Sequence, residues 1–378
     1  MRRARHLMAQ LTSFEALWLA SRRARRGKRR SPGAAAFEHH LEANLLQVQA
    51  SLRDGSFRWL GYRTFEVRDP VPRTIRAAPF RDRVVHHALC AQLEPLLERR
   101  MIEDSFACRV GKGTHRAVAR LERFLRAGGW VVKVDVRKYF FAIDHALLRA
   151  QLRQVVADPA VLQLLDTLLD TYDATPEVPY PLPGDHRVAT APGTEGAIDA
   201  AGRPRGLPIG NLTSQLLANA FLTPVDRFIK EQLRVRRYVR YMDDLVLVAP
   251  DRATAQAWLA AVAGQLAALR LLPHPRKTQL FPATNGVRFL GFRVYPDGRR
   301  IRRDNLQRLV RRMRRQMVAV HRGHLPPDRV LASLRSWLGF ADPVRHRTLL
   351  NAVLAPLRFH PPGATLPFTY WIPEHPPG

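Results

Sequence analysis

Apolar residues recur along this chain at two spacings, one typical of helices and one typical of strands. Spacing of three to four residues predicts helices over 8–20, 35–53, 84–98, 114–126, 145–169, 212–233 and 254–271. Alternating or continuous apolar runs predict strands within 61–80, over 131–136 and over 287–295, and a β-hairpin over 235–249. From Asp304 the pattern is again helical and strongly basic, so helices and short strands are expected throughout.

Three segments depart from this pattern. Residues 171–205 are rich in Pro, Gly, Ala and acids, and a stretch of this length without periodicity is usually a functional loop or an insertion. The chain ends in a Pro-rich tail from about Pro361. The basic run from Arg22 to Arg30 is either a solvated face or a contact to an RNA backbone.

The composition points to a polyanionic partner. The chain has 378 residues, enough for two or three structural units, and a formal net charge of +29. Of its 61 basic residues six are lysines and 55 are arginines, and arginine binds phosphate through two hydrogen bonds at once. GC-rich codon usage would favour Arg over Lys, but it does not explain the excess of positive charge. Nucleic acid is therefore the leading partner.

Two further features limit the class of protein. Cys90 and Cys108 are the two cysteines, which excludes a disulfide framework and a Cys-rich zinc site. No run approaches 18 apolar residues, and the basic N-terminus lacks the apolar core of a signal peptide. We therefore expect a cytoplasmic protein that does not engage a membrane.

Three acids carry the candidate chemistry. Asp243 and Asp244 lie at the tip of the predicted hairpin, where Asp is common even without a function. Asp135 lies in a strand of valines, where a carboxylate is costly unless it is paired with an arginine or bound to a metal. If the three meet, they can hold two divalent cations for in-line phosphoryl transfer, and oxygen ligands alone suit Mg²⁺.

These acids belong to an ordered set of motifs that resembles the reverse transcriptases of bacteria and phages. The palm motifs are Asp135 with Phe140, Gly206–Gln215 and Tyr241–Asp244. Four further segments resemble the motifs that flank the palm motifs in this family. They are Arg81–Leu89, Ser105–His115, His274–Gln279 and Phe289–Phe292. The resemblance covers roughly residues 20 to 345.

The resemblance implies an RNA-directed DNA polymerase with a right-hand α/β (α+β) fold, built from an antiparallel-sheet palm, helical fingers and a helical basic thumb. The implied domains are a basic helical extension (1–60), fingers (61–130), palm with part of the fingers and the 171–205 insertion (131–300), thumb (301–355) and Pro-rich tail (356–378).

The resemblance also implies a set of site residues. These are Asp135, Asp243, Asp244 and Lys277 as catalytic groups; Arg73, Phe140, Pro208, Ile209, Gly210 and Gln215 at the nucleotide; Phe289, Leu290 and Gly291 as the primer grip; Arg308, Arg311, Arg312 and Arg315 on the nucleic-acid backbone; and Asp135, Val136, Asp243 and Asp244 as metal ligands.

Several of these roles have plainer alternatives. Phe140 resembles the steric gate against a ribose 2′-OH, but it could be a core aromatic. Lys277 is either a proton donor or phosphate contact, or a surface lysine in a turn. Phe289 and its neighbours could be a plain buried strand. Arg73 resembles the arginine that clamps the triphosphate, although Val71 stands where the family usually has lysine.

Within the family, the chain most resembles the reverse transcriptases of diversity-generating retroelements. Ile209-Gly210 and Ser214-Gln215 are that group's variant of Gln-Gly and Ser-Pro. An isoleucine offers no polar contact near the incoming nucleotide, which would weaken discrimination between pairing geometries and favour errors opposite template adenines. The alternative is that Ile209 is a well-packed loop residue.

The implied cofactors are two Mg²⁺ ions, for which Mn²⁺ could substitute. The implied partners are an RNA template with its cDNA primer duplex, dNTPs and a small helical-bundle accessory protein. Two other hypotheses remain open: an antiphage or retron-like reverse transcriptase, and a catalytically silent RNA-binding scaffold similar to a maturase.

Overall fold

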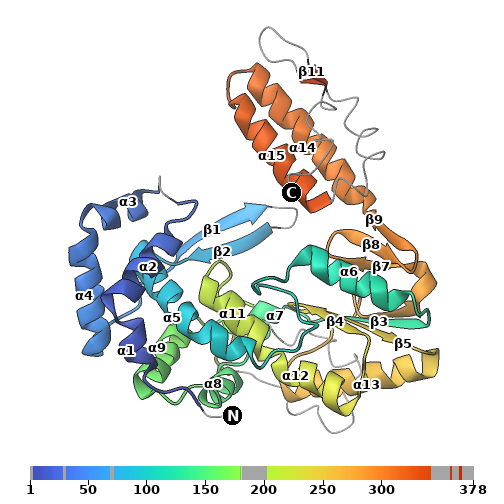
Figure 1. The fold of residues 1–378 in the computed structure, drawn as a ribbon, viewed down its shortest axis with the longest axis horizontal. Helices are drawn as coiled ribbons and strands as arrows, with labels where there is room; N and C mark the ends of the chain where they lie inside the picture. Colours follow the sequence, from blue (N-terminus) through green and yellow to red (C-terminus); the bar gives the residue numbers. More distant parts are fainter. Residues whose placement is uncertain are drawn as a thin grey trace. The chain divides into compact units, whose positions relative to one another are not determined.

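The computed structural model describes residues 3–28, 31–68, 72–178, 180 and 202–341, and the main chain of 358–359 and 366–367. Most of the predicted 171–205 loop and of the Pro-rich tail therefore lies outside the described residues. The chain divides into two compact units, 1–113 with 129–281 and 114–128 with 282–378 (Figure 1). The five-part domain division stays a prediction.

The first unit begins with four helices: α1 (Leu7–Leu11), α2 (Phe14–Ala24), α3 (Pro32–His39) and α4 (Leu41–Arg53). The sequence predicts helices over 8–20 and 35–53, and the structure breaks both. Ser13 ends the first, because its side chain accepts a hydrogen bond from Ala16 N at 3.2 Å and so caps a new helix. The second is broken at His40.

The expected edge strands within 61–80 are confirmed. β1 (Arg63–Arg68) and β2 (Pro72–Ala77) form an antiparallel pair, and α5 (Phe80–Glu98) follows directly. Its buried side chains, among them Val84, Val85 and Leu89, join the core of the unit.

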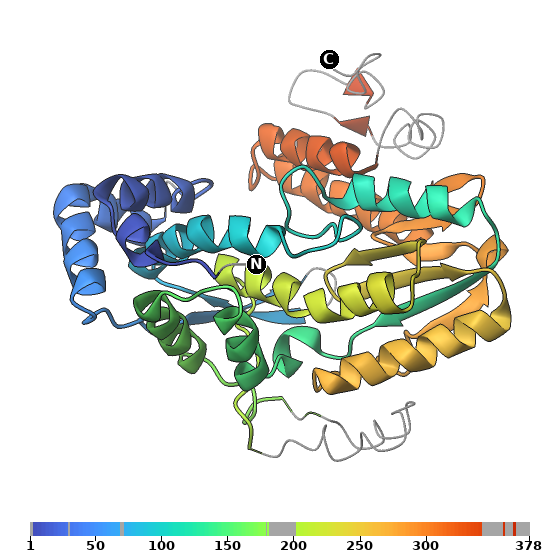
Figure 2. The same ribbon diagram turned by 60° about the horizontal axis from the view of Figure 1, so that its bottom comes forward.

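A four-stranded sheet forms the centre of the first unit, in the order β4-β5-β3-β6. Its strands are β3 (Trp130–Asp135), β4 (Tyr238–Tyr241), β5 (Asp244–Ala249) and β6 (Gln279–Pro282). β5 pairs antiparallel with both β3 and β4, so the predicted strand and hairpin are confirmed. Helix α13 (Arg252–Ala268) runs along β3 and β5 (Figure 2).

The remaining helices of this unit are α7 (Tyr139–Ala142), α8 (His145–Arg153), α9 (Pro159–Asp170), α11 (Leu212–Phe221), α12 (Thr223–Arg227) and a π-helical turn, Phe228–Gln232. The prediction of one helix over 145–169 is wrong. Asp158 caps a second helix by accepting hydrogen bonds from Ala160 N and Val161 N, and Pro159 fixes its first turn. The predicted helix 212–233 is likewise divided.

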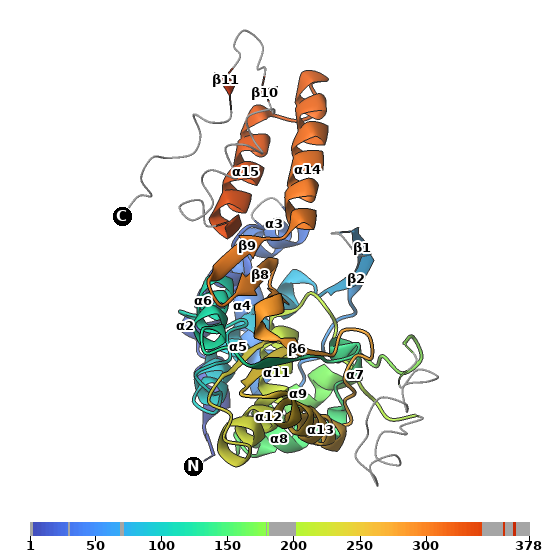
Figure 3. The same cartoon turned by 90° about the vertical axis from the view of Figure 1, so that its right-hand side faces the viewer.

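The second unit contains α6 (Thr114–Leu125), a short 3₁₀ turn (Ala283–Asn285), the antiparallel strands β7 (Val287–Phe289), β8 (Phe292–Tyr295) and β9 (Gly298–Ile301), and helices α14 (Arg303–His321) and α15 (Pro327–Ala341), which lie side by side (Figure 3). A two-residue pair, β10 (Arg358–Phe359) with β11 (Leu366–Pro367), completes the strands described.

The predicted single strand over 287–295 is wrong. Leu290 and Gly291 both have positive φ, 48° and 86°, as a tight type I′ hairpin turn requires, and the chain reverses between β7 and β8. A Cβ at Gly291 would lie 2.6 Å from Phe340 Cζ, so a glycine fits here. The predicted mixed α/β class with antiparallel sheets is confirmed.

Candidate active site

The strands of the central sheet bring the acids of two distant segments together. Asp135 is the last residue of β3 and Asp244 is the first residue of β5, and the two are register partners in the antiparallel pair. Directly opposed residues present their side chains on the same face of a sheet. Val136 N donates to Asp243 O at 3.2 Å, which holds the third acid at the same edge.

The tip of the hairpin is a tight, strained turn. Tyr241 pairs with Asp244, so two residues, Met242 and Asp243, connect β4 to β5. Met242 has φ 56°, a left-handed conformation that costs a residue other than glycine about 1–2 kcal/mol. Arg240 Nη1 donates to Met242 O at 3.1 Å and helps hold this conformation.

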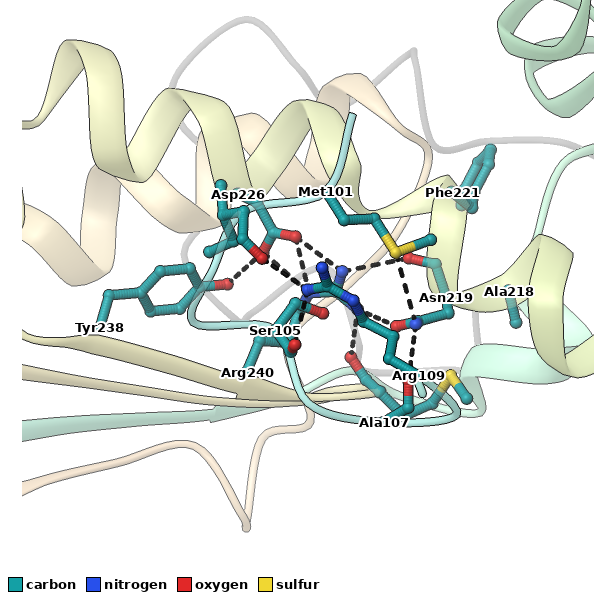
Figure 4. A network of polar contacts seen from close by, with 12 residues as sticks. Met101, Ser105, Ala107, Arg109, Ala218, Asn219, Phe221, Asp226, Tyr238 and Arg240 are labelled. Atoms are coloured by element: carbon teal, nitrogen blue, oxygen red, sulfur yellow. Dashed lines mark hydrogen bonds and ion pairs between the residues drawn. The ribbon is translucent and has the colours of Figure 1, made fainter. Parts of the chain in front are cut away.

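Arg240 is the centre of a buried polar network (Figure 4). Its guanidinium and the Asp226 carboxylate are both 0% exposed and lie 2.6 Å apart at their closest, Nη2 to Oδ2. Asn219 accepts from Arg240 through its side-chain oxygen and its carbonyl, at 2.9 and 3.1 Å, and Tyr238 OH donates to Asp226 at 2.7 Å. Although burial opposes it, the Asp226 charge raises the pKa of Arg240 above its usual value.

Sequence reasoning missed this network. One signal was available, since Arg240 lies in an apolar strand, where an arginine needs an acid partner. The sequence pattern does not identify Asp226 as this partner. Asp226 lies on α12 and Arg240 lies on β4, and the two elements come into contact only in the folded structure.

Two lysines neutralise the acids. Lys133 Nζ lies 2.8 Å from Asp244 Oδ2, with side chains 14% and 21% exposed. Lys277 Nζ lies 3.1 and 3.3 Å from the two oxygens of Asp135. Lys277 reaches this place because His274 N donates to Asp135 O at 2.7 Å, which fixes its segment beside the end of β3.

The electrostatics of the acids reflect their crowding. Burial, followed by the neighbouring Asp135 charge, raises the pKa of Asp243 to about 6. Burial also raises the pKa of Asp244, against the opposing effect of Lys133. The site thus holds negative charge that a cation would stabilise.

The donor atoms suit a hard divalent cation. The predicted ligands offer only oxygens, from the three carboxylates and from the carbonyl of Val136. Asp244 Oδ1 is buried with no hydrogen-bond partner among the described residues. In the arrangement seen, however, no three His, Cys, Asp or Glu side chains of the described ranges form a group that could hold a metal ion. Lys133 is paired with Asp244 and Lys277 is paired with Asp135. A cation that binds these carboxylates would therefore displace a lysine.

The first residues of the predicted Gly206–Gln215 motif are hydrogen-bonded to neighbouring elements. Arg76 N of β2 donates to Ile209 O at 2.8 Å, and Leu207 N donates to Phe140 O at 2.7 Å. Gly210 has φ 123°, and a Cβ there would lie 2.7 Å from Ile75 Cγ2, so a larger residue would push β2 away. The structure therefore joins the segment of Pro208, Ile209 and Gly210 to Phe140 of α7 and to β2, on which Arg73 is exposed.

Gln215 lies at a cationic cavity. Its Oε1 lies 3.7 Å from Sγ of Cys108, an exposed residue. The cavity measures about 390 Å³ and has Gly210 and Gln215 in its wall. The cationic side chains that line it are Arg23, Arg26, Lys28 and Arg83. His86 and His87 also line it, and burial lowers the pKa of both imidazoles. Part of the basic run 22–30 thus borders the predicted nucleotide segment.

The remaining predicted residues belong to the second unit. Phe289 is buried, whereas Leu290 and Gly291 form the β7–β8 turn and are half-buried. On α14, Arg308, Arg311 and Arg315 are exposed and Arg312 is half-buried, while Leu309 and Met313 face the core. Helix α14 thus presents a basic face and an apolar face.

One known protein family matches most of this chain. Residues 69–294, more than half of the chain, match the family described as "Reverse transcriptase (RNA-dependent DNA polymerase)". The chain therefore belongs to the reverse transcriptase family.

Among individual relatives, the chain is 27% identical over 151 residues to "Nuclear intron maturase 2, mitochondrial" of Arabidopsis thaliana, covering 36% of this chain and 20% of the relative. It is 22% identical over 197 residues to "Putative COX1/OXI3 intron 1 protein" of Saccharomyces cerevisiae, covering 50% and 21%. It is 23% identical over 263 residues to "Protein YkfC" of Escherichia coli, covering 59% and 63%. The chain thus spans about a fifth of the first two relatives.

One solved structure similar to this chain is telomerase from Candida albicans in complex with a fragment of telomeric RNA. It matches with a TM-score of 0.44 and 10% identity, over 78% of this chain and 55% of that one. Among the helices of the described ranges, none is long and apolar enough to cross a membrane.

Proposed function

We propose that this chain is an RNA-directed DNA polymerase that makes cDNA by two-metal phosphoryl transfer. The observation that carries the proposal is the register of Asp135 with Asp244, which sets acids from two segments of a reverse transcriptase domain at one sheet edge. The raised pKa of Asp243 supports it, because crowded carboxylates are typical of a cation site.

Asp135, Asp243, Asp244 and the Val136 carbonyl would hold the cations. Bound there, two Mg²⁺ ions would activate the primer 3′-hydroxyl and stabilise the pyrophosphate leaving group. Lys277, which reaches Asp135 at 3.1 Å, would move to the leaving pyrophosphate and donate a proton or a hydrogen bond.

Phe140 and Arg73, which lie near the Gly206–Gln215 motif and on β2, would select and bind the nucleotide. Phe140 would exclude a ribose 2′-OH, and Arg73 would bind the triphosphate. Replacing Phe140 with alanine is expected to allow ribonucleotide incorporation, measured by primer extension with rNTPs. A Phe140→Ala enzyme that gains no ribonucleotide incorporation would contradict the gate.

Primer extension on an RNA template tests the proposal. Asp243→Asn and Asp135→Asn should each lower the extension rate by at least ~10³-fold, because each removes a charged ligand from the reacting centre. Asp328→Asn, an exposed acid in the first turn of α15, is the matched control and should extend normally. Equal extension by the wild type and the Asp243 variant would rule out polymerisation at this site.

We further propose that the polymerase is of the diversity-generating type, error-prone opposite template adenines, and works with a small helical-bundle accessory protein. The support is Ile209-Gly210 beside β2, which provides no polar side chain at residue 209. Sequencing of cDNA should show errors concentrated at adenines, and Ile209→Gln should reduce them. Uniformly accurate copying would refute this proposal.

A maturase-like RNA-binding role is the second candidate, favoured by the name of the Arabidopsis relative. It predicts tight RNA binding that does not depend on Asp135 or Asp243, with no extension by the wild type. An antiphage or retron-like polymerase would extend primers but show no bias at adenines.

A further inference from the structure

Three arginines stand in a single row across the β7–β8–β9 sheet. Arg288 of β7 is the register partner of Arg293 in β8, and Arg293 is the register partner of Arg300 in β9. All three are exposed. We name Arg288, Arg293 and Arg300 the arginine row.

Such a row is unfavourable for the fold alone. Like charges directly opposed on neighbouring strands repel each other, and each such pair destabilises a sheet by a fraction of a kcal/mol. The opposite face of β8 supplies the packing: Phe292 and Val294 are buried, and helix α6 packs against this strand. The arginine row therefore contributes little to the core and concentrates positive charge on the other face.

An aromatic ring and a cavity accompany the row. The Tyr295 ring lies beneath two of its guanidinium groups, with Arg293 at 5.5 Å and Arg300 at 5.1 Å from the ring centroid. The row borders a cavity of about 520 Å³. The other residues that line it are Tyr295, Ile301, Arg302, Arg303, Asp304 and Gln307.

The wall of this cavity contains five arginines and one acid. Arg293 donates through Nε and Nη2 to the carbonyl of Asn285, at 3.2 and 2.7 Å, which anchors one side of its guanidinium. Asp304, the one acid in the cavity wall, is paired with Arg302 at 2.8 Å. Four further arginines line the wall against this single carboxylate.

We propose that the arginine row, which flanks the Phe289–Phe292 motif on β7 and β8, is a binding site for the phosphodiester backbone of nucleic acid, distinct from the α14 arginines. The inference rests on the proposed function, which supplies the template and primer. Neighbouring strands lie about 4.8 Å apart, so the row holds three cations within about 10 Å and can contact successive phosphates. Tyr295 adds a surface on which a base or sugar can pack.

The test is the salt dependence of RNA binding by the full chain. Filter binding of radiolabelled RNA, and of an RNA–DNA hybrid, is measured from 50 to 300 mM salt without dNTPs. Arg293→Gln/Arg300→Gln should weaken binding about 10- to 100-fold at 100 mM salt. It should also reduce the slope of log K against log salt by about 1.5. Arg329→Gln/Arg335→Gln on α15 removes equal charge from exposed positions and should bind almost like wild type.

Thermal unfolding separates binding from structure. The Arg293→Gln/Arg300→Gln chain loses the hydrogen bonds from Arg293 to Asn285 and also the repulsion between the arginines, so it should melt close to wild type. Wild-type affinity and slope in this variant, or equal losses in the α15 control, would overturn the proposal. Since no dNTP is used, failure of wild-type primer extension would count against the polymerase and not against this result.

Discussion

Arginine occupies two very different settings in this protein. Arg240, in the first unit, is wholly buried, and its guanidinium is paired with Asp226 and hydrogen-bonded to Asn219. In the second unit, Arg293 and Arg300 face solvent, with like charges as their cross-strand neighbours. The first setting stabilises the turn between β4 and β5, where Arg240 donates to Met242 O. The second leaves positive charge exposed on the surface of the sheet. Charge alone therefore does not identify a binding residue, since its partners and burial must be known.

The largest effect should come from breaking the buried pair. Arg240→Leu leaves the Asp226 carboxylate buried and unpaired, and should lower the free energy of unfolding by about 3–5 kcal/mol. Arg300→Leu on the exposed sheet should change it by less than about 0.5 kcal/mol. Urea unfolding followed by circular dichroism measures both.

A double variant sharpens this result. Arg240→Leu/Asp226→Leu removes both charges together, and should recover much of the loss because no uncompensated charge stays buried. If Arg240→Leu were no more harmful than Arg300→Leu, the buried network would have no structural role.

A smaller effect is expected from pH. Burial, then the charges of His87 and Arg83, lowers the pKa of His86 in the first unit to about 3. Below pH 6.5 the His86 imidazole is protonated in the unfolded chain but stays neutral in the folded chain. This difference favours the unfolded state. The free energy of unfolding is therefore highest above pH 6.5 and decreases as the pH falls toward 3. At pH 5 the loss is about 2 kcal/mol.

His86→Gln is the matched variant for this pH dependence. The free energy of unfolding, measured at pH 7.5 and at pH 5, should fall less between them in His86→Gln than in wild type. The difference between wild type and His86→Gln isolates this one side chain, which belongs to the first unit. An identical fall in both proteins would mean that His86 is protonated in the fold.

The smallest effect should be that of salt on the arginine row. Raising salt from 50 to 500 mM screens repulsion between exposed charges, and should stabilise the row by a few tenths of a kcal/mol. The buried Arg240–Asp226 pair should respond little. This stabilisation by salt is measured as the shift in melting temperature, and it should be absent in Arg293→Gln/Arg300→Gln. If the variant were stabilised as much as wild type, the repulsion would come from other residues.

Much of the fold could be predicted from periodicity. The valines of β3 predicted the correct strand because they are the residues that the strand buries. β1 and β2 were also predicted from their alternation, although every residue of β1 is exposed. The errors lie where a local signal interrupts the period. Asp158 and Pro159 start a new helix inside an apolar repeat, and Leu290 with Gly291 turns an apolar run back on itself.

The site was predictable to a different extent. Asp135, Asp243 and Asp244 could be chosen from their motifs, and the hairpin prediction put two of them at one tip. Arg240 and Asp226 could not be paired, because their contact joins a strand to a helix through the core. The arginine row could not be predicted because the turn at Leu290 and Gly291 was not predicted. This turn places Phe289 opposite Phe292, and the antiparallel register then places Arg288 opposite Arg293.

The placement of the two cysteines has a practical consequence. Cys90 is 3% exposed, whereas Cys108 is accessible and touches Gln215 beside the cationic cavity. Burial raises the pKa of both thiols, so alkylation is faster at alkaline pH, and only Cys108 can react in the folded chain. A maleimide fluorophore would thus label the unmodified protein at one position, beside Gln215 and the cationic cavity.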